Sequence, residues 1–434
     1  MKQPSAGSPA AWFFACLACV LMLAGCTSPA SNGSTTDATA GSGSAALPAA
    51  AAPEAAVAAP AAAPATPAAP LPVLPFDEAV QTAASNLLGK AQLPPDTQWD
   101  VVIDPLMDGV TGTQTQATRA LGTRITRIIK DSFPRYAVQP FNSSSLMRGP
   151  LLLVGTFTGV NDERKTEGKR VAYRICLALA DLKTGKLVGK GLAFADAEGV
   201  DATPLPYYRD APAWVEDATT LGYIRTCQGT RAGDAIHPAY IDRVLTSATL
   251  AEANEAYAAG KYSAARDLYV AARSSPGGEQ LRTYTGLYLT HWRLGNRAAA
   301  AEAFGHIVEQ GLENKRLGMK FLFRPGTAAM WSDPRSGPVA YPLWFNEIAK
   351  HAAARQSCLE VVGHASASGP EPVNERLSLL RAETVRSEIA RQAPPLAQRM
   401  IANGMGSRQT MIGTGRDDLS DALDRRVEFK VVDC

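Results

Sequence analysis

The chain has almost no net charge and lacks the residue patterns on which many enzymes and metal sites depend. Its 434 residues carry 43 Lys and Arg against 41 Asp and Glu, a formal net charge of +2, which gives no electrostatic basis for nucleic-acid binding. The five His residues form no H-E-x-x-H motif, and no G-x-S-x-G, Walker A or G-x-G-x-x-G motif occurs. We therefore predict a protein that is not an enzyme and that uses no metal or cofactor.

Long apolar runs are also scarce. The longest, residues 11–24, follows Lys2 and is too short to span a membrane stably. It runs into Leu23-Ala24-Gly25-Cys26, which matches the bacterial lipobox. We predict a signal peptide over 1–25 and a diacylglycerol on the Cys26 thiol, although an uncleaved anchor with a chance match is the alternative. Thr27, in place of Asp, favours an outer-membrane lipid anchor that faces the periplasm.

Charged residues nearly vanish between the anchor and the first domain. Residues 26–75 consist mainly of Ala, Pro, Ser, Thr and Gly, and Asp37 and Glu54 are the only charged ones. Such a segment buries little apolar surface, so it is predicted to be disordered or partly polyproline II. At full extension this tether spans on the order of 100–150 Å.

Cysteines are few, and their spacing is unlike that of metal sites. Four lie beyond residue 26, and an even number in an exported protein predicts two disulfides with three possible connectivities. We favour pairing within domains, Cys176 with Cys227 and Cys358 with Cys434. The second pair is expected to meet if the first and last strands of the C-terminal domain are antiparallel neighbours.

Residues 76–235 are predicted to form a mixed α/β domain, in a chain that we assign to the α/β multidomain class. Helical periodicity covers 76–91 and 113–133, and the region ends in a long Pro- and Gly-rich loop over 196–234. Strands are predicted at 99–106, 136–141, 151–160, 170–181 and 186–195. This order implies a small sheet with helices on one face. It is similar to that of periplasmic lipoprotein domains of the CsgG and LpoB type.

Residues 236–315 are predicted to be an α-helical repeat. Small and aromatic residues alternate at helical spacing, and Gly260 and Gly295 lie 35 positions apart. That spacing is close to the 34-residue tetratricopeptide (TPR) period, which the segment resembles. The resemblance implies either a docking surface for a periplasmic protein partner or a spacer.

Residues 316–434 carry the most informative pattern. Gly363-His364-Ala365-Ser366 follows an apolar strand, and a helix bears Asn374 and Leu377-Ser378-Leu379-Leu380-Arg381-Ala382. Gly413-Thr414-Gly415 and Asp424-Arg425-Arg426-Val427-Glu428 come later. Together they resemble the OmpA-like peptidoglycan-binding domain, an α/β sandwich with the pattern G-H-T-D-x-x-G, N-x-x-L-S-x-x-R-A, G-x-G and N-R-R-V-E.

The resemblance implies a site for the diaminopimelate residue of the peptidoglycan stem peptide. In that family an Asp in the loop pairs with the ligand ammonium, and the helix Arg binds the ligand carboxylate. Arg381 matches the Arg, whereas Ser366 stands where the family has Asp. The predicted site comprises Ser366, Arg381, His364 and Asn374. The alternative for His364 is a structural role, and the alternative for Arg381 is an ion pair on the surface of the helix.

Two further expectations concern the surroundings of that site. Asn374 is expected to cap the N-terminus of the helix, along which Leu377, Leu380, Val385 and Ile389 recur at helical spacing. Glu371 or Glu375 is a candidate for the missing negative charge, whereas Asp417 is expected to be solvated in a polar loop.

We therefore predict an outer-membrane lipoprotein that links the membrane non-covalently to peptidoglycan and binds protein partners through its other domains. The alternative is a periplasmic scaffold, for a secretion or wall-synthesis machine, whose C-terminal domain has lost wall binding through Ser366.

Overall fold

The computed structural model describes residues 70–434, except 215–216, 336–338, 414, 416 and 418. The predicted signal peptide, Cys26 and nearly all of the tether lie outside the described residues. Residues 68–434 form one compact unit. Among the described helices, none has the length and apolar character needed to cross a membrane.

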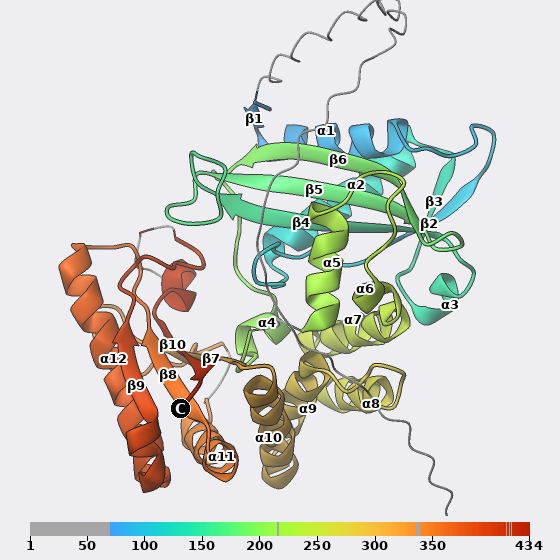
Figure 1. Ribbon diagram of the computed structural model, residues 1–434. Coiled ribbons are helices and arrows are strands. Elements are labelled where there is room, and N and C mark those ends of the chain that lie inside the picture. The colour runs from blue at the N-terminus through green and yellow to red at the C-terminus, as the bar shows by residue number, and fades with distance from the viewer. Residues whose placement is uncertain (1–69, 215–216, 336–338, 414, 416, 418) are drawn as a thin grey trace, which may run out of the picture. The chain divides into compact units, whose positions relative to one another are not determined.

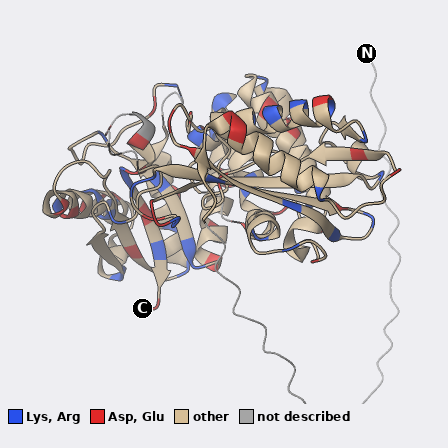
Figure 2. Cartoon of the chain, turned by 90° about the horizontal axis from the view of Figure 1, so that it is seen from above, with Lys and Arg blue, Asp and Glu red and all other residues tan. Residues whose placement is uncertain are grey.

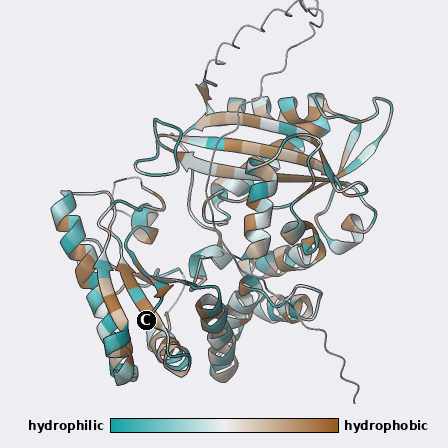
Figure 3. Cartoon of the chain, viewed as in Figure 1, coloured by the Kyte–Doolittle hydropathy of each residue, from teal (hydrophilic) through white to brown (hydrophobic). Residues whose placement is uncertain are grey.

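The first part of this unit is built on a six-stranded mixed sheet with strand order β1-β6-β5-β4-β2-β3 (Figure 1). β2 pairs in parallel with β3 and β4, whereas β4, β5 and β6 form an antiparallel meander. Every residue of β4 is buried, and Figure 3 shows the hydrophobic character of the central strands. The strands are β1 Val73–Leu74, β2 Trp99–Ile103, β3 Tyr136–Gln139, β4 Leu151–Val160, β5 Ala172–Asp181 and β6 Lys186–Asp196.

Helices cover both faces of this sheet, so the expectation of helices on one face is wrong. α1 (Phe76–Gly89) and α2 (Gln116–Ser132) share a core with one face. On the other face, side chains of α5 (Ala218–Gln228), α6 (Pro238–Ile241) and α7 (Val244–Ala258) form a second core. A short helix, α3 (Ser143–Leu146), follows β3.

The segment predicted as a long loop, residues 196–234, contains two helices, α4 (Pro206–Asp210) and α5. α5 has a Gly and several Thr residues, which lowers its intrinsic helix propensity. Asp217 caps it by accepting a hydrogen bond from the Thr220 backbone N–H at 2.8 Å, and burial of its Tyr223 stabilises it against the sheet. Tertiary packing therefore overrides a weak local signal.

Two helical hairpins follow: α7 packs on α8 (Tyr262–Arg273), and α9 (Leu281–Arg293) packs on α10 (Arg297–Glu313). Gly260 and Gly295 both occupy the turn between the helices of a hairpin, with φ of 73° and 80°. This left-handed conformation favours glycine, so the 35-residue spacing marks equivalent turns. Their assignment to the TPR type stays a prediction.

The C-terminal part is a four-stranded sheet, in the order β7-β10-β8-β9, that carries the helices α11 and α12. β10 is antiparallel to β7 and β8, and β9 is parallel to β8. This arrangement confirms the predicted α/β sandwich. The elements are β7 Arg316–Leu322, α11 Tyr341–Ala354, β8 Cys358–Gly363, α12 Glu371–Gln392, β9 Met400–Gly404 and β10 Arg426–Val432, with short 3-10 turns at Pro394–Arg399 and Leu419–Leu423.

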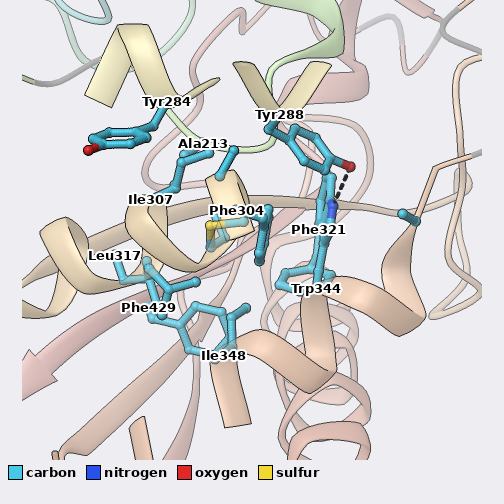
Figure 4. Close-up of a cluster of buried hydrophobic side chains, with 14 of the residues drawn as sticks. Ala213, Tyr284, Tyr288, Phe304, Ile307, Leu317, Phe321, Trp344, Ile348 and Phe429 are labelled. Carbon is cyan, nitrogen blue, oxygen red and sulfur yellow. Dashed lines mark hydrogen bonds between the residues drawn. The ribbon is translucent and has the colours of Figure 1, made fainter. Parts of the chain in front are cut away.

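The helical hairpins and the C-terminal sheet share a single hydrophobic core (Figure 4). Phe304 of α10 stacks on Trp344 of α11 with ring centroids 5.6 Å apart. The Trp344 indole N–H donates to the Tyr288 hydroxyl at 2.7 Å, and Phe321 of β7 lies edge-on to the Trp344 ring. A single apolar core therefore extends across the predicted domain boundary between residues 315 and 316.

The two predicted disulfides differ in outcome. Cys358 and Cys434 are bonded in the structure, where Cys358 begins β8 opposite the end of β10. Cys176 and Cys227 are free thiols, so the predicted bond between them is absent. They do lie side by side, with each Sγ against the backbone carbonyl oxygen of the other residue, at 2.8 and 2.9 Å.

Candidate functional site

The candidate site lies where β8 ends and α12 begins. Gly363 closes β8, and a Cβ added there would lie 1.9 Å from the Ser378 carbonyl oxygen, so only glycine permits this approach of helix to strand. α12 starts at Glu371, with Pro372 in its first turn. Asn374 is therefore already inside the helix, and its expected role as the cap is wrong.

A cavity of about 290 Å³ opens between this loop, α12 and the loop after β9. It brings together three of the four predicted site residues, Ser366, Arg381 and Asn374. His364 is not among the lining residues. The complete lining is Gly326, Ala365, Ser366, Ser368, Val373, Asn374, Arg376, Leu377, Leu380, Arg381 and Asp417.

Arg381 is fully buried, not in an exposed ion pair. Its Nε, Nη1 and Nη2 groups donate to the carbonyl oxygens of Thr327, His364 and Arg324 at 3.0, 3.0 and 3.1 Å. Burial, together with repulsion from the nearby Arg425, lowers the pKa of Arg381 to about 10. The guanidinium therefore stays charged at neutral pH, and it ties residues 324–327 to the loop after β8.

Asp417 supplies a carboxylate at the position where the loop after β8 lacks one. The Ser366 hydroxyl donates to Asp417 Oδ1 at 2.6 Å, and Arg425 Nη1 donates to the same oxygen at 2.8 Å. Asp417 also lines the cavity, so the expectation that it is solvated in a polar loop is wrong. A carboxylate 51 positions away along the chain thus lies beside the serine that replaces the family aspartate.

Asp424 holds the segment that leads to Asp417. Its carboxylate accepts hydrogen bonds from the backbone N–H groups of Met411, Ile412 and Gly413, the latter two at 2.8 Å. Burial raises the pKa of Asp424, and the bonds from Ile412 and Gly413 oppose that rise. This replacement of the family Asn therefore keeps an acceptor for three backbone donors.

The two glutamates that were candidates for the missing charge lie elsewhere. Glu371 accepts hydrogen bonds from Ser407, and Glu375 pairs with Arg408. Both therefore bind the loop after β9, and neither is among the residues that line the cavity.

Asn374 presents an unused donor at the cavity wall. Its side chain is 5% exposed, and its Nδ2 has no hydrogen-bond partner among the described residues. A buried amide N–H without an acceptor costs about 1–3 kcal/mol. A ligand oxygen in the cavity would satisfy it.

The His364 side chain does not line the cavity and lies beside Glu428 of β10. Its Nε2 lies 3.0 Å from Glu428 Oε1, and its side chain is 1% exposed. Burial and the neighbouring Arg426 lower the pKa of His364 to about 4, so the ring is neutral at physiological pH. The part of this residue that contributes to the site is its carbonyl oxygen, through Arg381.

An apolar rim borders the cavity on α12. Val373, Leu377 and Leu380 recur at helical spacing and line it, with Val373 58% and Leu380 49% exposed. Of the four apolar residues at helical spacing, Val385 and Ile389 are buried, whereas Leu377 and Leu380 border the cavity. The buried face of α12 comprises Asn374, Ser378, Arg381, Ala382, Val385 and Ile389.

A comparison with protein-family models matches this part of the chain. Residues 342–421 match the model of the OmpA family, so the chain carries an OmpA-like domain at its C-terminal end. No curated protein matches the chain.

Three solved structures show similarity to a part of this chain. The peptidoglycan-associated lipoprotein from Burkholderia pseudomallei is 19% identical, with a TM-score of 0.23, over 26% of this chain and 89% of that one. The C-terminal domain of Helicobacter pylori MotB is 18% identical, with a TM-score of 0.21, over 26% of this chain and 86% of that one. The cell wall anchor of the T6SS from Pseudomonas aeruginosa is 20% identical, with a TM-score of 0.22, over 30% of this chain and 95% of that one.

Proposed function

We propose that this protein binds the diaminopimelate stem peptide of peptidoglycan in the cavity lined by Ser366, Asn374, Arg381 and Asp417. The observation that carries the proposal is the Ser366–Asp417 hydrogen bond. It places a carboxylate in the same cavity as a guanidinium and an unpartnered amide donor. The OmpA family match over 342–421 supports the ligand class.

The free end of diaminopimelate carries an ammonium and a carboxylate, and the cavity has a counterpart for each. Asp417, oriented by Ser366, accepts from the ammonium. Asn374 Nδ2 donates to the carboxylate, and the positive charge of Arg381 attracts it. The exposed side chains of Val373 and Leu380 pack against the apolar part of the stem peptide.

We further propose that the chain is an outer-membrane lipoprotein anchored through Cys26 and that it acts as a non-catalytic link to the wall. The lipobox at residues 23–26 and the long Ala- and Pro-rich segment support this. A Cys26→Ala variant should lose incorporation of labelled palmitate and should leave the outer-membrane fraction. Retention of the label in that variant would refute the anchor.

A second candidate function is a periplasmic scaffold without wall binding. The observation that favours it is the full burial of Arg381, whose guanidinium is bonded to three carbonyl groups. In that case the helical hairpins would recruit a protein partner.

Co-sedimentation of residues 68–434 with purified sacculi separates the two candidates. The whole compact unit is used because the core shared across residue 315 would be exposed in a shorter fragment. Wild type should pellet, and Asp417→Asn should bind roughly tenfold to a hundredfold more weakly, since one hydrogen bond to a charged group contributes about 1.5–3 kcal/mol. Asp433→Asn, an exposed carboxylate of the same part, is the matched control and should bind as wild type does.

A carboxylate swap tests the position of the charge. Asp417→Ser should weaken binding, and Ser366→Asp added to it should restore binding, because the carboxylate then stands where the family has it. Failure of the wild type to pellet would reject wall binding and favour the scaffold.

A further inference from the structure

A second cavity, of about 560 Å³, lies in the N-terminal sheet, far along the chain from the OmpA-like domain. Its wall is formed by residues of β5 and β6, by Lys90 directly after α1, and by the end of α5 with the segment that follows. Two thiols line it, Cys176 on β5 and Cys227 on α5, with 6% and 1% of their surface exposed.

The charged side chains that line this cavity are all positive. They are Lys90, Arg174, Lys190 and Arg231, and no carboxylate is among the lining residues. Within the part of the chain that the structure describes, none of the four forms a salt bridge. Arg174 donates instead to the Gln228 side-chain oxygen at 2.9 Å. Unpaired like charges around a cavity raise the local concentration of anions.

The cations are placed to act on one of the two thiols. Lys190 Nζ lies 3.8 Å from Cys176 Sγ and 3.3 Å from Thr230 Oγ1, and it also donates to the Cys227 carbonyl oxygen. Hydrogen bonding from Cys227 and the charges of Lys190 and Arg174 lower the pKa of Cys176, although burial opposes this. Burial raises the pKa of Cys227 instead. The pair is therefore asymmetric, with Cys176 favoured as the thiolate.

We propose that this cavity is a thiol-exchange site for small anionic disulfides, with Cys176 as the attacking thiolate and Cys227 as the resolving thiol. The positive side chains attract the carboxylates of the ligand, and Cys176, which lines the same cavity, supplies the reactive sulfur. A site for a simple inorganic anion would need the charges but not the two thiols.

The exchange balances without a further oxidant. Cys176 S⁻ attacks one sulfur of R–S–S–R, a Cys176–S–S–R bond forms, and RS⁻ leaves. Cys227 then passes its proton to that thiolate and attacks Cys176 Sγ, which forms the Cys176–Cys227 bond and releases the second RS⁻. One disulfide is reduced to two thiol equivalents, and the dithiol of the protein is oxidised.

The test compares a dianionic aromatic disulfide, 5,5′-dithiobis(2-nitrobenzoate), with the neutral 4,4′-dithiodipyridine. Residues 68–434 are reduced, freed of reductant and reacted with each reagent. Rates are followed by peptide mass spectrometry on the Cys176 peptide, so Cys358 and Cys434 do not enter the result. Wild type should form the Cys176–Cys227 bond, whereas Cys227→Ser should stop at a mixed disulfide on Cys176.

Charge variants test the role of the wall. Lys190→Gln should slow the reaction with the dianionic reagent roughly tenfold and slow the neutral reagent less, because only the former uses the attraction. Lys186→Gln, on the same strand but not among the lining residues, should change neither rate. Thermal melting shows whether each variant is folded.

Three results would overturn the proposal. They are an unreactive Cys176 in the folded protein, first attack at Cys227, and an equal loss of rate with both reagents in Lys190→Gln.

Discussion

Replacing Arg381 with Met should destabilise the C-terminal part of the protein, whatever it does to ligand binding. Arg381 is fully buried, and it is the shared donor to the carbonyl groups of Arg324, Thr327 and His364. Methionine keeps much of the apolar stem but removes all three hydrogen bonds and the charge.

The magnitude follows from those contacts. A hydrogen bond to a charged group contributes about 1.5–3 kcal/mol, and a carbonyl left unsatisfied in the interior costs about 1–3 kcal/mol. Removing the costly burial of a guanidinium offsets part of this loss. We expect a net loss of about 2–5 kcal/mol, which is a large fraction of the 5–15 kcal/mol that stabilises a typical domain.

Urea unfolding of residues 68–434, followed by circular dichroism and Trp fluorescence, measures this loss. Arg391→Met is the matched control, because Arg391 lies on the same helix and is largely exposed. Its unfolding midpoint should stay close to that of wild type. Arg381→Lys should remain destabilised, since one ammonium cannot reach three carbonyl groups in the geometry of a guanidinium fork.

The reasoning fails if Arg381→Met unfolds at the same urea concentration as wild type. If that variant also lost binding to sacculi, its guanidinium would serve the ligand and not the loop. A stable variant that does not bind would support direct binding of the ligand carboxylate by Arg381, as the family pattern implies.

Two further predictions concern stability. Loss of the Cys358–Cys434 bond, by Cys434→Ser or by reductant, should cost about 4–5 kcal/mol, because the bond closes a loop with a sequence separation of 76; an unchanged urea midpoint under reductant would contradict this. Burial lowers the pKa of Lys320 to about 7, below its value in the unfolded chain. Between about pH 7 and 10.5 the native state therefore binds fewer protons than the unfolded chain. The contribution of Lys320 to the free energy of unfolding rises with pH across that window. Urea unfolding at pH 6 and at pH 9 should therefore show a free energy of unfolding that is higher by about 2–3 kcal/mol at pH 9 in wild type, and this rise should be missing from Lys320→Met. An identical rise in both proteins would refute the assignment.

Much of the architecture could be predicted because it depends on local pattern. The strands at 151–160 and 170–195 have dense apolar runs around a Thr-Gly turn, and they occur within a residue or two of their predicted positions. Ser366 and Arg381 were placed correctly on a loop and a helix, since the Gly-rich loop and the helical spacing are both short-range signals.

The errors occur where long-range packing competes with local pattern. α5 has weak helix propensity, and burial against the sheet stabilises it. Leu377 and Leu380 are more apolar than Ser378, yet Ser378 faces inward, because its hydroxyl accepts a hydrogen bond from the backbone N–H of Gly406 in the loop after β9. Asp417 was missed because no local signal connects it to a serine 51 positions earlier.

Sequence alone determined the kinds of elements, their order, the OmpA-like motif and the candidate residues Ser366 and Arg381. Periodicity, turn residues and motif spacing depend on residues close together in the chain, so they can be read directly from the sequence. The tertiary structure alone decided that Asp417 lies beside Ser366 in one cavity, that Arg381 holds a loop, and that Cys176 and Cys227 share a cationic cavity. Each of these depends on which distant segments come into contact, and packing of the whole core determines that.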